Sequence, residues 1–266
     1  MKIHSSLLRK SRYFLPAAIF LALCLLIQCK KSEQPADVPA FDAEKAKEHI
    51  ISGRQANAFT TELRTSLARL EANNARLANK TLYLTPSVLF SRETLAGLLR
   101  QPGVTGVRIY AGRLNNGKTT LLAVATNNRG QDIPSLIVSP EKTLDITEAS
   151  ALVHSFRTSI ESVNPLNLPR SELFNRDAIA VLLNKKQAAS VRIYWGSENG
   201  AACMILVPVN AAGNDIHTRL LARDGEEGGD DPGDEKEPGD DDEAIERGHR
   251  CPHSCDVGGP IDDGNP

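Results

Sequence analysis

The hydrophobic and polar positions of the chain follow the same order twice. Residues 107–112 read VRIYAG and residues 191–196 read VRIYWG, with apolar and polar positions alternating in the same phase. The match runs back without a gap to Leu89 and Leu173, and after a one-residue deletion it continues to Ile133 and Ile216. A self-match at a nearly fixed offset indicates an internal duplication.

Each copy predicts two helices followed by two strands. The second helix is expected to start at Ser91 in one copy and at Asn175 in the other, both good N-cap residues. The VRIY strand follows, and Asn-Gly pairs at 116–117 and 199–200 predict tight turns into the strands 120–126 and 203–209. The first helices are predicted from apolar residues at helical spacing, namely Phe59, Leu63, Leu67 and Leu70 in the first copy and Ala149, Leu152, Val153, Phe156 and Ile160 in the second.

This order predicts an α+β fold of two tandem α-α-β-β repeats that share an antiparallel sheet, packed against helices on one face. Repeat 1 is expected over residues 41–133 and repeat 2 over residues 144–217, with a proline-bearing linker at 134–143. An isolated hairpin is marginal in water, which favours packing of the copies against each other. Upstream, the copies are aligned by pairing Phe41-Asp42 with Leu144-Asp145, Ala46 with Ala149 and Arg54 with Arg157. This alignment implies an insertion in the first copy between Arg54 and Leu89.

Alternation along the two VRIY strands assigns their side chains to two faces. Ile109 and Ile193 are expected in the core together with Val107 and Val191, and Trp195 is also expected there. Arg108 and Tyr110 project from one face of the first strand, as Arg192 and Tyr194 do in the second. These four residues either contact a ligand, such as a sugar or an anion, or form a solvent-facing surface on which Arg stacks against Tyr. Asp132 and Asp215 each follow a glycine and are interpreted as turn residues.

The N-terminus has the layout of an export signal. A basic stretch up to Arg12 precedes an apolar run from Tyr13 to Ile27, which is shorter than the roughly 20 residues that span a membrane. The run ends in Leu26-Ile27-Gln28-Cys29 and resembles a bacterial lipoprotein signal peptide. The resemblance implies that residues 1–28 are removed and that Cys29 is lipidated; the alternative is an uncleaved signal anchor. Residues 29–40 are then a polar tether, and the Lys30-Lys31 pair implies an outer-membrane location.

The formal charge is divided unevenly along the chain. Residues 223–266 hold 4 Lys and Arg against 16 Asp and Glu, whereas residues 30–222 hold 23 against 17. The C-terminal segment 218–266 is therefore predicted to be a disordered acidic tail, because so charged a segment buries too little apolar surface to fold.

Four potential metal ligands lie close together in this tail: His249, Cys251, His253 and Cys255. Their spacing resembles no zinc finger. In an exported protein a Cys251–Cys255 disulfide is favoured, with unpaired thiols and a metal site as the alternatives. The acidic run lacks the spacing of a calcium loop, and no metal is expected.

No catalytic constellation is found in the sequence, and no cofactor is expected. Nucleic acid is disfavoured as a partner because the positive charges are scattered and aromatic residues are few. The sequence therefore favours a lipid-anchored cell-envelope protein with a duplicated binding or scaffolding module, whose partner is an envelope protein or a glycan. The alternative is a hydrolase of envelope or extracellular polymers.

Overall fold

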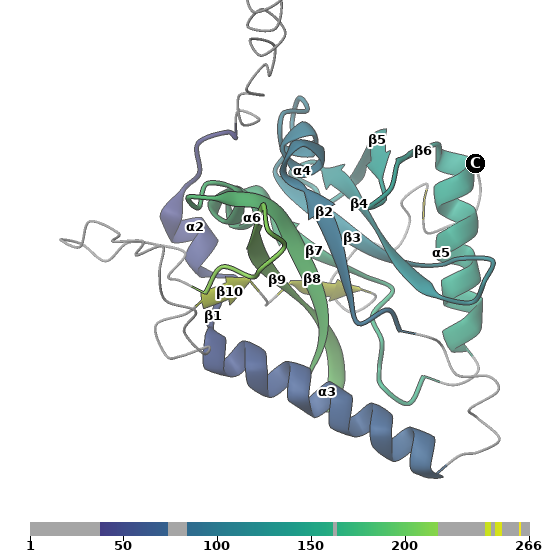
Figure 1. Cartoon of the computed structure of the whole chain (residues 1–266). Helices are drawn as coiled ribbons and strands as arrows, with labels where there is room; N and C mark the ends of the chain where they lie inside the picture. The colour runs from purple at the N-terminus through teal and green to yellow at the C-terminus, as the bar shows by residue number, and fades with distance from the viewer. Residues whose placement is uncertain are drawn as a thin grey trace, which may run out of the picture. The chain divides into compact units, whose positions relative to one another are not determined.

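The computed structural model describes residues 38–73, 84–161, 164–217, 243–245, 248–251 and 261. All of these residues belong to one unit, Ala36–Pro266. As predicted, the unit is α+β, and its described part contains five helices and two antiparallel sheets (Figure 1). The helices are α2 (Ala43–Lys47), α3 (Gly53–Asn73), α4 (Arg92–Leu99), α5 (Ile146–Glu161) and α6 (Arg176–Leu183). The strands are β1 (Ile50–Ser52), β2 (Ser87–Ser91), β3 (Gly106–Arg113), β4 (Thr119–Thr126), β5 (Asp132–Val138), β6 (Thr143–Leu144), β7 (Ser171–Asn175), β8 (Ala188–Glu198), β9 (Ala201–Asn210), β10 (Glu243–Ile245) and β11 (His249–Cys251).

Local sequence signals place the short helices and one hairpin as predicted. The Ser91 side chain accepts a hydrogen bond from the Thr94 amide at 3.1 Å and caps α4. The Asn175 side chain accepts one from the Ala178 amide at 2.7 Å and caps α6. Asn199, with a φ of 53°, and the glycine that follows it form a two-residue turn between β8 and β9, where both residues need a positive φ.

The two predicted hairpins lie in different sheets. The strands β3 and β4 belong to a sheet with the order β11-β7-β3-β4-β5-β6, which we call the β3 sheet. The strands β8 and β9 belong to a sheet with the order β1-β10-β9-β8-β2, which we call the β8 sheet. The prediction of a single shared sheet is therefore wrong.

Exchanged strands join the two halves of the chain. The strand β2, which precedes α4, pairs with β8 of the second half, from Ser87 opposite Tyr194 to Ser91 opposite Ser190. The strand β7, which precedes α6, pairs with β3 of the first half. The α-α-β-β order contained neither strand, because each is only five residues long and runs directly into a helix. Each hairpin thus gains a third strand from the other half, which helps because an isolated hairpin is only marginally stable.

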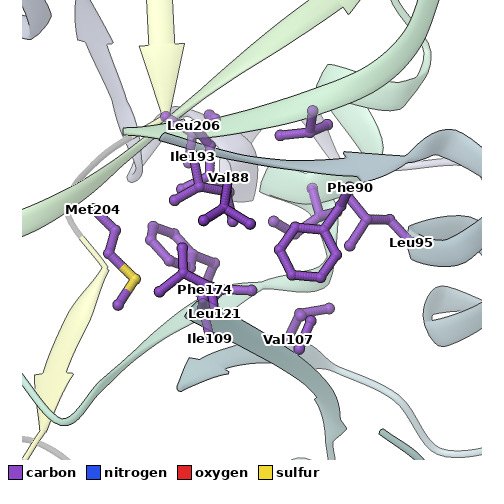
Figure 2. Packing of buried hydrophobic residues seen from close by; sticks show 14 of the residues in the cluster. Val88, Phe90, Leu95, Val107, Ile109, Leu121, Phe174, Ile193, Met204 and Leu206 are labelled. Carbon is purple, nitrogen blue, oxygen red and sulfur yellow. The ribbon is translucent and has the colours of Figure 1, made fainter. Parts of the chain in front are cut away.

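The two sheets pack face to face around the main hydrophobic core. Figure 2 shows Val88, Ile193 and Leu206 of the β8 sheet facing Val107, Ile109 and Phe174 of the β3 sheet. Ile109 and Ile193 are 0% and 1% exposed, and Val107 and Val191 belong to the same cluster, so the predicted core face is confirmed. Trp195 is also buried in this cluster.

A long helix covers the outer face of each sheet, so helices lie on both sides of the sandwich rather than on one. The helix α3 packs over β8 and α5 packs over β3 (Figure 1). Glycines allow these close approaches. A Cβ added at Gly196 would lie 3.1 Å from the Phe59 Cβ, and one added at Gly112 would lie 3.2 Å from the Leu152 Cβ. The last residue of both VRIYxG segments is therefore the point where a helix crosses its strand.

The predicted first helix of the first copy is divided into two helices. The helix α2 ends at Lys47, β1 follows, and α3 starts at Gly53. The Ser52 Oγ accepts a hydrogen bond from the Gln55 amide at 3.2 Å, and Gln55 Oε1 accepts one from the Ser52 amide at 3.0 Å. This reciprocal pair is a capping box, so a new helix begins there.

The segment 134–143 is not the open linker that its prolines suggested. The strand β5 runs from Asp132 to Val138 and pairs with β4, and β6 adds Thr143 and Leu144 to the same sheet. The pairing register shifts between Val124 and Ala125, which leaves the exposed Pro134 beside this irregularity. A bulge is where a strand tolerates proline, because proline has no amide hydrogen to donate.

The C-terminal segment also contributes to the fold, so its prediction as a wholly disordered tail is wrong. The strand β10 lies between β1 and β9, with Ile245 opposite both Ile50 and Leu206. The strand β11 pairs with β7 along the edge of the β3 sheet. Ala244, Ile245 and Ile261 are all buried. Residues 218–242, which hold much of the acidic charge, lie outside the described residues.

Candidate functional site: two Arg-Tyr-Asp clusters

The same three side chains meet in each half of the molecule. Cluster 1 consists of Arg108 and Tyr110 of β3 and Asp132 of β5. Cluster 2 consists of Arg192 and Tyr194 of β8 and Asp215, which forms an isolated bridge with Val209 of β9. In both clusters the Arg donates to the Tyr and the Asp, and the Tyr donates to the other oxygen of the Asp. The two predicted Arg-Tyr pairs are thus each completed by an aspartate.

Cluster 1 is closed and buried. The Arg108 guanidinium donates to Asp132 Oδ1 at 2.8 Å, to Tyr110 Oη at 3.3 Å and to the Gly130 carbonyl at 2.6 Å. The Tyr110 hydroxyl donates to Asp132 Oδ2 at 2.7 Å. The side chains of Arg108 and Asp132 are only 4% and 0% exposed, so this ion pair is shielded from water. Such a pair is costly to break because either partner would leave a buried charge.

Cluster 2 has the same bonds but is more open. Arg192 donates to Asp215, to Tyr194 Oη at 3.2 Å and to the Gly213 carbonyl at 2.8 Å. The Tyr194 hydroxyl donates to Asp215 Oδ2 at 2.5 Å. The side chains of Arg192 and Asp215 are 22% and 14% exposed, and Tyr194 is half-buried. Cluster 2 is therefore the one of the two that solvent reaches.

The turn before each aspartate holds it in place. The Asn127 Oδ1 accepts hydrogen bonds from the amides of residues 129 and 131, at 2.9 and 3.1 Å. The Asn210 Oδ1 accepts the equivalent bonds from residues 212 and 214, at 2.9 and 3.0 Å. Gly130 and Gly213 have positive φ angles of 71° and 88°, which glycine adopts without strain. The side chains that form these turns are therefore those of Asn127 and Asn210, and not those of Asp132 and Asp215 as the sequence suggested. Each turn delivers the aspartate to its Arg-Tyr pair.

Burial and charge stabilise the protonated tyrosines. Burial, followed by the negative charge of Asp132, raises the pKa of the Tyr110 hydroxyl above its ordinary value. Burial and the hydrogen bond to Asp215 also raise the pKa of Tyr194. Burial alone would lower the pKa of Arg192, but the hydrogen bond with Tyr194 and the charge of Asp215 leave it above its ordinary value. Each cluster therefore combines a cation, an anion and a neutral hydroxyl donor.

The structure separates the four predicted ligand contacts into two classes. Arg108 and Tyr110 are 3% and 2% exposed, so a ligand would reach them only if the cluster opened. Arg192 and Tyr194 retain exposed surface, and their role as ligand contacts stays a prediction. The predicted stacking of Arg against Tyr has a counterpart in both clusters, with guanidinium carbons 5.8 and 5.9 Å from the ring centroids.

Sequence reasoning missed the contribution of Asp132 and Asp215 to these clusters. The signal was present, because a Gly-x-Asp-Ile segment recurs at 130–133 and at 213–216. It was assigned to turn formation alone, since each aspartate lies more than 20 residues from its arginine and no local rule links the two.

A buried carboxylate between the sheets was also missed. Glu172 of β7 is 0% exposed, and both of its carboxylate oxygens lie 3.2 Å from the amide nitrogen of Met204 in β9. The glutamate thus joins one sheet to the other through a charge-assisted hydrogen bond. Nearby, the imidazole of His49 accepts a hydrogen bond from the Asn175 amide at 3.4 Å.

The predicted cysteine chemistry lies largely outside the described residues. Cys29 and Cys255 are not among them, and Cys251 is described only as the last residue of β11. Cys203 of β9 is buried, as its position in a strand predicted. Within the described part of the chain, no group of three or more His, Cys, Asp and Glu side chains could hold a metal ion. None of the helices described is both long and apolar enough to cross a membrane.

Comparison with protein-family models, with curated proteins and with solved structures finds no match to this chain.

Proposed function

We propose that this chain is a lipid-anchored cell-envelope protein whose duplicated module acts by binding or scaffolding. The observation that carries this proposal is the recurrence of one Arg-Tyr-Asp cluster, with the same bonds, in both halves. A hydrolase specialises one copy of a duplicated module and assembles titratable groups there that the other copy lacks. A binding or scaffolding module keeps the same arrangement in both copies.

The duplication is supported by the matching positions of paired strands. The order β2-β8-β9-β10-β1 in one sheet corresponds strand by strand to β7-β3-β4-β5-β6 in the other. In this correspondence β10, from the C-terminal segment, takes the place that β5 has in the first half. Ile245 lies opposite Leu206 as Val138 lies opposite Ala123.

The same correspondence changes the upstream alignment of the copies. Phe59 packs against Gly196 as Leu152 packs against Gly112. The first helix of the first copy is therefore α3, and Ser52 matches Asp145, whose side chain accepts a hydrogen bond from the Glu148 amide at 2.8 Å. The match of Asp145 is then Ser52 and not Asp42, which was its match in the sequence alignment. The elements α2 and β1 lie between these two residues. The additional length of the first copy then lies between the start of α3 and β2.

The exposed cluster is the part of the module proposed to contact a partner. The side chain of Arg192 is 22% exposed and Tyr194 is half-buried. Their guanidinium and hydroxyl are groups that suit the hydroxyl and carboxylate groups of an envelope glycan or of a protein surface. Cluster 1 is the internal control, because its bonds are the same and its side chains are buried.

Matched substitutions in the two clusters test this binding role. Residues 38–266, which retain β10 and β11, are incubated with envelope glycans and envelope extract. Tyr194→Phe removes the hydroxyl of the partly exposed cluster and is expected to lower retention on the ligand. Tyr110→Phe removes the hydroxyl of the buried cluster and is expected to leave retention unchanged. Equal retention by both variants contradicts a contact at cluster 2. Hydrolysis of an offered polymer that depends on cluster 2 supports the alternative function.

The anchor is proposed from the N-terminal segment. Cleavage before Cys29 and its acylation would attach the module to the outer membrane through the tether 29–40. Replacement of Cys29 by Ser is expected to release the protein from the membrane fraction or to leave its precursor unprocessed. A variant that is processed and fractionates like the wild type contradicts lipidation at this residue.

A further inference from the structure

Within the part of the chain that the structure describes, one edge of the β8 sheet has no strand beside it, whereas the corresponding edge of the β3 sheet is covered. Among the described residues, β2 (Ser87–Ser91) has β8 as its single neighbour. Its counterpart β7 has two neighbours, β3 on one side and β11 on the other. The three positions that β11 covers, 171–173, correspond to positions 87–89 of β2. Among the residues described, an antiparallel strand therefore lies at this place in the β3 sheet and none lies there in the β8 sheet.

The open edge lacks the features that usually protect an edge strand. Monomeric proteins guard exposed edges with charged residues, prolines or bulges. The sequence of β2, SVLFS, contains none of the first two, and its pairing with β8 is regular. The nearest charge, Arg92, donates to the Leu183 and Ala188 carbonyls of the second half.

The edge also carries an exposed apolar side chain. Val88 and Phe90 point into the core at 7% and 0% exposure, so Leu89 points to the opposite face. Leu89 is 40% exposed, and no other large hydrophobic side chain is exposed in the described part of the chain. It lies opposite Arg192 in the β2–β8 pairing, so it borders cluster 2.

We propose that β2 pairs antiparallel with β2 of a second copy of the chain, about a two-fold axis at Leu89. The strand reads nearly the same in both directions, so Ser87 would lie opposite Ser91 and Val88 opposite Phe90. No like charges meet in this arrangement, and both Leu89 side chains fall on one face beside the axis. The contact is isologous, as in most protein dimers. It joins the two β8 sheets into one continuous sheet and closes both open edges.

The dimer is expected to be weak and reversible, because the contact is centred on a five-residue strand and is small compared with the standard interface of about 1,600 Å². The full chain, purified in detergent, is expected to sediment as a mixture of monomer and dimer that shifts with concentration. Leu89→Lys places two like charges at the axis and is expected to give monomer throughout that range. Asn128→Lys, at an exposed position in the β4–β5 turn, is the matched control and is expected to dimerise like the wild type.

A cysteine at the axis provides the second readout. Leu89→Cys is expected to form a reducible dimer under mild oxidation, beyond the background from the native cysteines, whereas Asn128→Cys is not. Thermal melting verifies that each variant folds. Wild-type protein that stays monomeric at every concentration overturns the proposal, as does a dimer that survives Leu89→Lys. A cysteine at position 89 that links only to another protein also overturns it and points to a foreign strand at this edge.

Discussion

At the scale of single residues, the glycine that ends each VRIYxG segment is explained by packing rather than by backbone freedom. Gly112 and Gly196 lie in strands and neither has a positive φ. At both positions an added Cβ would lie only 3.1–3.2 Å from the Cβ of a helix residue. The sequence showed that the glycine recurs but not why. The approaching residues, Leu152 and Phe59, come from helices that are far away along the chain.

Replacing Gly196 by Ala is expected to destabilise the protein. The new Cβ would lie 2.6 Å from Ile205 Cδ1 and 3.1 Å from the Phe59 Cβ, so side chains or the helix must move. Such overpacking costs about 1–3 kcal/mol in the free energy of unfolding, measurable by urea denaturation. Gly97→Ala in α4 is the control, because its Cβ would meet only Leu136 Cδ2 at 3.8 Å. That change is expected to be neutral or to stabilise by up to about 1 kcal/mol, and equal losses in the two variants would contradict the packing argument.

The raised pKa of Tyr110 predicts a pH dependence of stability. The folded state holds the Tyr110 proton more tightly than the unfolded state, whose tyrosines titrate near about pH 10. The contribution of this group is therefore complete below pH 10 and is lost as the pH rises above it, because unfolding then releases a proton. Tyr110→Phe is expected to lower stability at pH 8, by about 0.5–1.5 kcal/mol for the lost hydrogen bond, and to flatten the decline above pH 10. Parallel wild-type and variant curves in denaturation between pH 8 and 11 would contradict this assignment.

At the scale of elements, the sequence predicted best what local rules determine. The capping residues Ser91 and Asn175, the Asn199-Gly200 turn and the core faces of β3 and β8 are all found as expected. The strands β1, β2, β7 and β10 were not predicted, because each has three to five residues and is defined by its partners rather than by its own pattern. The two clusters were not predicted for the same reason, since Asp132 and Asp215 contact their arginines only after the hairpins have formed.

At the scale of the whole molecule, the C-terminal segment is a structural part of the protein. Ile245 is fully buried and lies between β1 and β9, two strands that are far apart in the sequence. The buried Ile261 belongs to the hydrophobic cluster around Tyr110. The acidic composition that predicted a disordered tail is concentrated in residues 218–242, and the segments on either side of them are in the fold. An average over residues 218–266 concealed the short apolar segment at Ala244 and Ile245.

Truncation after Ala222 is accordingly expected to lower the melting temperature strongly or to prevent folding. The loss of the Ile245 side chain alone corresponds to about 2–5 kcal/mol, or roughly 4–20 °C for a chain of this size. Truncation after Ile261 removes only five residues and serves as the control, with a melting temperature close to that of the full chain. If both truncations melt alike, β10 and β11 do not contribute to stability.

The pairing of β1 with β10 also governs when this protein can fold during its synthesis. Ile50 emerges from the ribosome well before its strand partner Ile245, because nearly 200 residues separate the two in the sequence. The exchange of β2 and β7 imposes the same delay on both hairpins, since neither sheet is complete until the second half exists. Contacts between residues so distant in sequence slow folding. A nascent chain of this topology therefore cannot complete the β8 sheet until β8, β9 and β10 have all been made, however early β1 and β2 appear.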